Sequence, residues 1–155
     1  MSKRELFGKI ASLAKRKDVL VRPPYFSDEL LFGSECIKCD AACQRACEEG
    51  IIYLLDDASP FLSFVNSGCT YCDECAKACE FGVLSIESKK LIDARIHIKI
   101  SACLSHNGVM CFACKDPCLE NAIDFIGLFK PTINNNCTAC GFCISRCPSG
   151  AIEVV

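Results

Sequence analysis

The chain has 155 residues, 16 of them cysteine, and its 17 basic and 19 acidic side chains give a formal net charge of −2. This balance gives no support to nucleic-acid binding through a basic surface. No apolar run approaches the roughly 18 to 20 residues of a membrane span, and no apolar segment typical of a secretory signal follows the basic N-terminus. We therefore expect a cytoplasmic protein that works with other proteins.

Residues 1–25 form a basic arm that differs in charge from the rest of the chain. Seven basic and two acidic side chains give the arm a net charge of +5, whereas the remainder has a net charge of −7. Ser2 and Glu5 match a capping box, and an apolar stripe follows, so we predict an amphipathic helix from about residue 3 to 17 that ends before Pro23. This helix has three candidate roles: docking onto the acidic body, binding a partner, or weak association with a membrane surface.

The cysteines carry the chemistry, and they fall into four groups of four. These are Cys36, Cys39, Cys43, Cys47; Cys69, Cys72, Cys75, Cys79; Cys103, Cys111, Cys114, Cys118; and Cys137, Cys140, Cys143, Cys147. The second and fourth groups read C-x2-C-x2-C-x3-C, and Pro148 follows the fourth, which is the bacterial ferredoxin run. Structural zinc needs other spacings, which neither His97 nor His106 supplies, and disulfides need an oxidising compartment. The pattern predicts sixteen thiolate ligands for four [4Fe-4S] clusters.

The way the groups pair is a separate question. A cubane cluster has four iron corners, so three thiolates from one tight loop need a fourth from elsewhere. In two-cluster ferredoxins the fourth cysteine of each run binds the cluster of the other run. Short distances along the chain favour adjacent pairing, first group with second and third with fourth. Crossed pairing, first with fourth and second with third, stays open.

The four groups belong to internal repeats, because their first cysteines lie 33, 34 and 34 residues apart. Each fourth cysteine is followed by a turn residue and an apolar pair, which is typical of a helical turn that leads into a strand. The turn residues are Gly50, Gly82, Asn121 and Gly150. We therefore expect a strand, a cluster loop, a short helix and a strand in every repeat.

Two strands and two connections can be predicted from local patterns. Alternation of apolar and polar side chains predicts strands at 61–65 and 95–100. The polar segments 56–60 and 87–93 predict hairpin connections.

Together these elements predict an α+β fold of tandem bacterial-ferredoxin-like modules behind an N-terminal amphipathic helix. With adjacent pairing, residues 26–92 form the first two-cluster module and residues 93–155 the second.

Two groups depart from the ideal spacing. Asp40 to Ala42 put three residues where two are usual, and seven residues separate Cys103 from Cys111. Longer loops alter cluster exposure and hydrogen bonding to sulfur, and hence the reduction potential, or they reflect simple loop tolerance. His106 lies in the long loop and is a lesser candidate to replace Cys103 as a ligand.

These features resemble the NapF family, the ferredoxin-type accessory proteins of periplasmic nitrate reductase systems. The residues that carry the resemblance are the basic arm, the segment Arg22-Pro23-Pro24-Tyr25, four ferredoxin-type motifs and the stretched third motif. The resemblance implies that the sixteen cysteines are ligands and that the protein is cytoplasmic. It also implies action on the precursor of the molybdenum-containing catalytic subunit before export, through insertion or reduction of its iron–sulfur cluster. The first group, with Asp40 to Ala42, departs from the family pattern.

Two functions remain open on the sequence. The first is a maturation and electron-transfer factor for the nitrate reductase catalytic subunit, and the alternative is a general polyferredoxin electron carrier or a subunit of another oxidoreductase complex. An enzyme is not expected, because every group has four cysteines, which leaves no iron open to a substrate, and because P-loop, dinucleotide-binding and zinc-protease motifs are absent.

Overall fold

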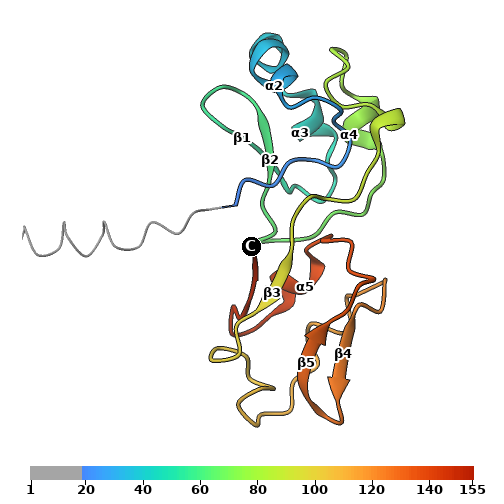
Figure 1. Cartoon of the computed structure of the whole chain (residues 1–155). Coiled ribbons are helices and arrows are strands. Elements are labelled where there is room, and N and C mark those ends of the chain that lie inside the picture. The colour runs from blue at the N-terminus through green and yellow to red at the C-terminus, as the bar shows by residue number, and fades with distance from the viewer. Residues whose placement is uncertain (1–18) are drawn as a thin grey trace, which may run out of the picture.

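The computed structural model describes residues 19–155, and its elements are short (Figure 1). The predicted helix over 3–17 lies outside the described residues. In the first half, shown in blue and green in Figure 1, the elements are α2 (Leu30–Glu35), a 3-10 helix (Cys36–Lys38), α3 (Ala42–Ala46), β1 (Ile52–Leu54), β2 (Pro60–Leu62), α4 (Glu74–Lys77) and a second 3-10 helix (Ile86–Ser88). In the second half, yellow to red, they are β3 (Ile96–Ile98), β4 (Ile123–Ile126), β5 (Phe129–Ile133), α5 (Phe142–Arg146) and β6 (Ile152–Val154).

The strands pair in the same way in both halves. β1 and β2 form an antiparallel hairpin, and so do β4 and β5. Outside each hairpin, the beginning of the half pairs with its end: Phe26 forms an antiparallel bridge with Leu84, and β3 pairs antiparallel with β6. The observed architecture is therefore α+β, as the sequence predicts.

The local predictions hold in part. The connection at 56–60 is a hairpin turn, in which the Leu55 N–H donates to the Ser59 carbonyl at 3.0 Å. The strand predicted at 95–100 is present but shorter, as β3, and the strand predicted at 61–65 overlaps β2 only at residues 61 and 62. The predicted hairpin connection at 87–93 is wrong, because the next strand, β3, takes β6 as its partner and not the strand before it.

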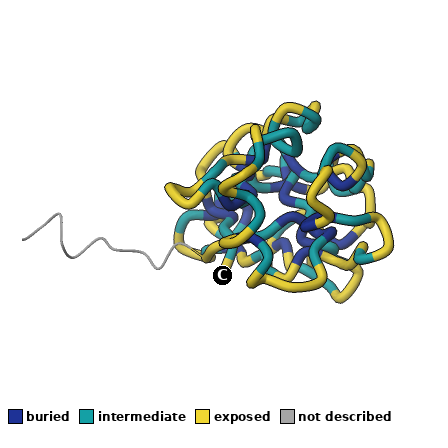
Figure 2. The backbone as a smooth tube through the Cα atoms, turned by 90° about the horizontal axis from the view of Figure 1, so that it is seen from above, coloured by how far each residue is buried: buried dark blue, intermediate teal, exposed yellow. Residues whose placement is uncertain are grey.

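Buried side chains form two clusters, one in each half. Figure 2 colours the backbone of buried residues dark blue. The first cluster contains Tyr25, Phe32, Ile51 and Leu84, and the second contains Ile98, Ile123 and Ile152. Cysteines of the four groups pack into both clusters. The thiols therefore lie against the apolar core of each half.

The last residues of segment 1–25 belong to the first core. Val21 and Tyr25 are 3% and 1% exposed, the Leu62 N–H donates to the Val21 carbonyl at 2.7 Å, and the Ser85 N–H donates to the Tyr25 carbonyl at 2.8 Å. In residues 19–155 no helix has the length and apolarity to cross a membrane.

Candidate metal centre

Three of the cysteine loops lead into a helix through a residue with left-handed backbone. These residues are Ala41 (φ 63°) before α3, Asp73 (φ 68°) before α4 and Gly141 (φ 86°) before α5. In the first group the additional residue is accommodated just before Ala41, at Asp40, whose exposed carboxylate pairs with Arg45 at 2.7 Å. The insertion is thus taken up at the surface and the left-handed turn into the helix is kept.

The third group lacks such a helix. Residues 113–117 form consecutive turns in place of one, and Pro117, which has no N–H to donate, lies at the point where the other groups have their helix. The helix in the cysteine loop is therefore present in three of the four groups and replaced by turns in the third.

Every group closes with the predicted turn. The N–H groups of Gly50, Gly82, Asn121 and Gly150 donate to the carbonyl of the preceding fourth cysteine at 3.0, 3.3, 3.2 and 3.2 Å. All four residues have positive φ, between 48° and 66°, which glycine and asparagine tolerate best. The prediction of a repeated turn after the fourth cysteine is confirmed.

In three groups the chain then turns a backbone N–H toward the sulfur of the fourth cysteine. Leu84 donates to Cys79 at 3.4 Å, Ala122 to Cys118 at 3.3 Å, and Ala151 to Cys147 at 3.2 Å. Such bonds stabilise a negatively charged sulfur.

A cavity of about 100 Å³ in the first half is lined by Cys69, Cys72 and Cys75 of the second group and by Cys47 of the first. These four thiols form the second tetrad. Burial and then the neighbouring thiols, Cys69 first, together raise the pKa of Cys75 to about 12. Cys47, the fourth cysteine of the first group, therefore lies with the first three cysteines of the second group.

The reciprocal exchange forms the first tetrad, Cys36, Cys39, Cys43 and Cys79. Burial raises the pKa of Cys36 to about 11, and among charged neighbours Cys79 and Cys39 contribute most. The pKa of Cys43 is also raised to about 11, by burial and then by Cys79, Cys36 and Cys39. In both cases the thiol that acts most strongly belongs to the second group.

The second half repeats this arrangement. A cavity is lined by Cys103, Cys111 and Cys114 of the third group and by Cys147 of the fourth, which form the third tetrad. Burial and then the thiol neighbours in the same tetrad together raise the pKa of Cys114 to about 11. Cys147 differs: burial raises its pKa, but hydrogen bonds from Ser149 and from the N–H of Ala151 outweigh burial and lower it.

The fourth tetrad consists of Cys137, Cys140, Cys143 and Cys118. Burial raises the pKa of Cys143 to about 12, with Cys140 and Cys137 the strongest neighbours and Cys118 among the others. The pKa of Cys137 is raised by burial and then by Cys140 and Cys118. The fourth cysteines of the third and fourth groups are thus exchanged as well.

The tetrads fit a cluster of positive iron atoms. Buried thiols that raise one another's pKa are poor anions by themselves, whereas a coordinated thiol is deprotonated because the metal supplies the compensating charge. Within the described residues no three possible ligands converge closely enough to hold one metal ion. A cubane does not need such convergence, because each thiolate binds its own iron corner.

A buried hydroxyl supports the same fit. Ser105 lies in the long loop of the third group, is 2% exposed, and its Oγ has no hydrogen-bond partner in the described structure. It lines the cavity of the third tetrad. A buried hydroxyl without a partner is costly, and a cluster sulfur in this cavity would be an acceptor for it.

The histidines do not join the tetrads. His106 Nε2 lies 3.0 Å from the Pro131 carbonyl oxygen, and the residues lining the third cavity do not include it. His97, on β3, is exposed and lies 3.9 Å from Glu153. The arrangement gives no support to His106 as a replacement for Cys103.

The segment Arg22-Pro23-Pro24-Tyr25 covers the second tetrad. Both prolines and Tyr25 line the cavity, and the Tyr25 hydroxyl accepts a hydrogen bond from the Asp73 N–H at 3.1 Å, next to Cys72. The cover is built from the first half's own core, so these residues have a structural role at the site.

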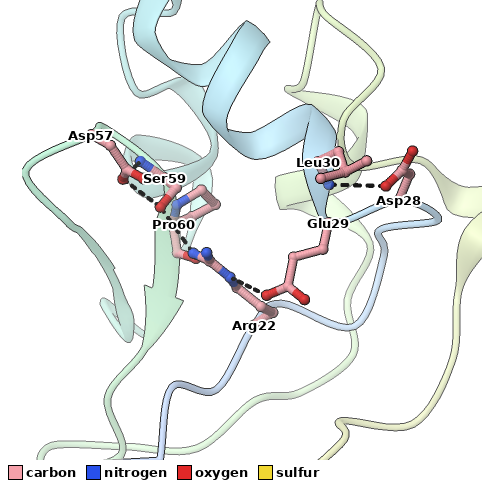
Figure 3. A network of polar contacts seen from close by, with 7 residues as sticks. All are labelled: Arg22, Asp28, Glu29, Leu30, Asp57, Ser59 and Pro60. Atoms are coloured by element: carbon pink, nitrogen blue, oxygen red, sulfur yellow. Dashed lines mark hydrogen bonds and ion pairs between the residues drawn. The ribbon is translucent and has the colours of Figure 1, made fainter.

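Arg22 fastens this cover to the β1–β2 hairpin, as Figure 3 shows. Its Nη1 donates to the Pro60 carbonyl at 2.8 Å and to Ser59 Oγ at 3.0 Å. Its guanidinium also lies 4.5 Å from the centre of the Phe32 ring, while Glu29 pairs with its Nε at 3.5 Å. The sequence signal for this clamp was the Arg-Pro-Pro-Tyr segment itself, whereas the unpartnered Ser105 had no sequence signal.

Known proteins resemble this chain in sequence. The family described as a 4Fe-4S binding domain matches residues 131–153, which contain the fourth cysteine group. The ferredoxin-type protein NapF of Escherichia coli (strain K12) is 36% identical over 137 residues, which cover 85% of this chain and 82% of that protein. NapF of Haemophilus influenzae is 32% identical over 160 residues, covering 96% and 90%. The ferredoxin-type protein NapG of Haemophilus influenzae is 28% identical over 158 residues, covering 85% of this chain and 56% of that protein. No solved structure matches the chain.

Proposed function

Since the chain belongs to the NapF family of ferredoxin-type proteins, we propose that it is an electron-transfer and maturation factor that binds four [4Fe-4S] clusters. Each tetrad would hold one cluster, so all sixteen cysteines are ligands. When bound, such clusters accept and release single electrons. The chain supplies the thiolates, the N–H groups directed at three of the sulfurs, and the apolar cover that keeps water away.

The observation that carries this proposal is the pair of cavities lined by four thiols each, one in either half. In both, three thiols come from one group and the fourth from its neighbour, which is the exchange that ties together a two-cluster ferredoxin. This supports adjacent pairing and two tandem modules. We place the start of the first module near Val21, since Val21 and Tyr25 are buried in its core.

The proposed partner is the precursor of the molybdenum-containing nitrate reductase catalytic subunit, met in the cytoplasm. The support is family membership together with the basic segment at the N-terminus. Every tetrad is complete, so we propose no catalytic site on the clusters. Binding measured under anoxic conditions separates the two candidate functions: preference for the signal-bearing precursor over the mature enzyme supports maturation, and equal binding to both favours a general electron carrier.

Metal analysis tests the cofactors directly. Anoxically prepared protein should contain about 16 iron and 16 acid-labile sulfide per chain. Zinc near four per chain without sulfide would overturn the proposal.

Pairing is tested with two matched variants. Cys79→Ser should abolish the paramagnetically shifted signals of the first group's cysteines, and Cys47→Ser those of the second group's. Crossed pairing predicts instead that Cys79→Ser damages the cluster of the third group. Signals of the third group that vanish in Cys79→Ser would contradict adjacent pairing.

A further inference from the structure

The two halves meet where two of the tetrads face each other. The Cys69 N–H, in the second tetrad, donates a hydrogen bond to the Cys140 carbonyl, in the fourth tetrad, at 2.7 Å. Two proposed ligands from different halves are thus joined by one hydrogen bond.

Two glycines allow the halves to approach closely around this bond. A Cβ added to Gly68 would lie 2.6 Å from the Phe142 backbone nitrogen and 2.7 Å from the Cys140 oxygen. On the other side, a Cβ at Gly141 would lie 2.3 Å from the Phe64 ring. Only residues without a side chain permit this approach of the two backbones.

Two further contacts cross the same junction. The Tyr71 hydroxyl donates to the Thr138 carbonyl at 2.6 Å and accepts from the Ile92 N–H at 3.1 Å. Ala139, 2% exposed, packs into the hydrophobic core of the first half. The loop of the fourth group is therefore embedded in the first half and does not merely touch it.

Within each half, a second set of close thiols links the tetrads. Cys43 of the first tetrad packs against the core cluster that contains Cys75 of the second, and Cys114 of the third is buried in one cluster with Cys143 of the fourth. With the Cys69–Cys140 contact these give three links between four sites. They join the sites in the order first, second, fourth, third.

We propose that the Cys69–Cys140 hydrogen bond is the bridge for electrons between the halves, so that electrons pass in the order first, second, fourth, third and not in the order of the sequence. Electron tunnelling weakens steeply with distance and is stronger through a hydrogen bond than through an open gap. The ends of the path are then the first and third tetrads, the two whose loops depart from the ideal spacing. This inference rests on the four-cluster function proposed above.

The test is Gly68→Ala, with Gly33→Ala as matched control, because a Cβ at Gly33 meets nothing within 4 Å. Iron and sulfide should match the parent protein in both variants. In the fully reduced anoxic protein, the magnetic interaction between the clusters of the second and fourth groups should be lost in Gly68→Ala and kept in Gly33→Ala. The interactions inside each half should persist in both. An unchanged interaction in Gly68→Ala overturns the proposal.

A milder variant covers the case in which Gly68→Ala loses iron. Tyr71→Phe removes the hydroxyl that joins Thr138 to Ile92 and adds no atom at the junction. A weaker interaction between the second and fourth clusters at full iron content supports the bridge, and an unchanged one overturns it. If the parent protein holds four clusters but the magnetic interaction joins the second and third sites, the proposed order of electron transfer is wrong and the four-cluster function stands. If the parent protein holds no clusters, the proposed function itself is wrong.

Discussion

Replacing Arg22 with alanine is the most direct test of the cover over the second tetrad. The Arg22 side chain is 12% exposed, and its Nη1 donates to both Pro60 and Ser59. Ser59 is fully buried, so water cannot easily replace the lost donor. The variant removes two charge-assisted hydrogen bonds and the contact with the Phe32 ring.

The size of the effect follows from these contacts. Hydrogen bonds to charged groups contribute about 1.5 to 3 kcal/mol each, and a cation–π contact contributes roughly 0.5 to 1 kcal/mol when partly exposed. Local relaxation recovers part of the sum, which leaves a loss of about 3 kcal/mol in the free energy of unfolding. For a chain of this size that corresponds to a midpoint lower by about 6 to 12 °C.

The assay is thermal bleaching of the cluster absorption under anoxic conditions, at one scan rate, because unfolding that releases metal is irreversible. Arg45→Ala is the control, since Arg45 pairs with Asp40 on the surface and an exposed pair contributes less than about 1 kcal/mol. In air, Arg22→Ala should lose the second group's cluster before the others, because Pro23 and Pro24 line that cavity. Equal midpoints for the two arginine variants would refute the clamp.

Three further predictions concern other parts of the chain. Ser105→Ala should lower the reduction potential of the third group's cluster by about 40 mV at unchanged iron content, because a hydrogen bond of about 1 kcal/mol is lost from the reduced form. A reduction potential equal to that of the parent protein would contradict the role of the hydroxyl. Residues 2–18 carry six basic and two acidic side chains. Their deletion should leave the iron content unchanged but make partner binding weaker and less sensitive to salt. Loss of iron would show that the arm supports the core. Chelation of the iron should abolish most hydrogen-exchange protection in both halves, so native protection after chelation would show that the fold stands without metal.

Features that depend on neighbours in sequence could be predicted. The turns after the fourth cysteines follow from Gly and Asn at fixed offsets, and their hydrogen bonds are repeated four times in the structure. The hairpin at 56–60 follows from local polarity in the same way. In these cases the residues that form the structure are adjacent in the chain, so one sequence is enough.

Features that depend on partners distant in the sequence could not be predicted in this way. The polar segment 87–93 signals a change of direction, but nothing in it reveals that β3 pairs with β6, more than fifty residues away. Arg22 likewise meets Ser59 and Pro60, which no local pattern connects to it. The choice between adjacent and crossed pairing had the same difficulty, because the spacing within each cysteine run is compatible with both pairings.

The long loop of the third group shows how the structure separates two interpretations that the sequence left open. The Asn107 side chain donates to the carbonyls of Ile100 and Cys103 at 3.0 and 2.8 Å, which folds the loop back on its own start. This fold buries Ser105 at the third cavity, while Val109 remains 53% exposed. A loop retained only because the surface tolerates it has no need to bury an unpartnered hydroxyl, whose desolvation is unfavourable. The first part of the insertion therefore encloses the third tetrad and supplies it with a donor, and only the second part is surface.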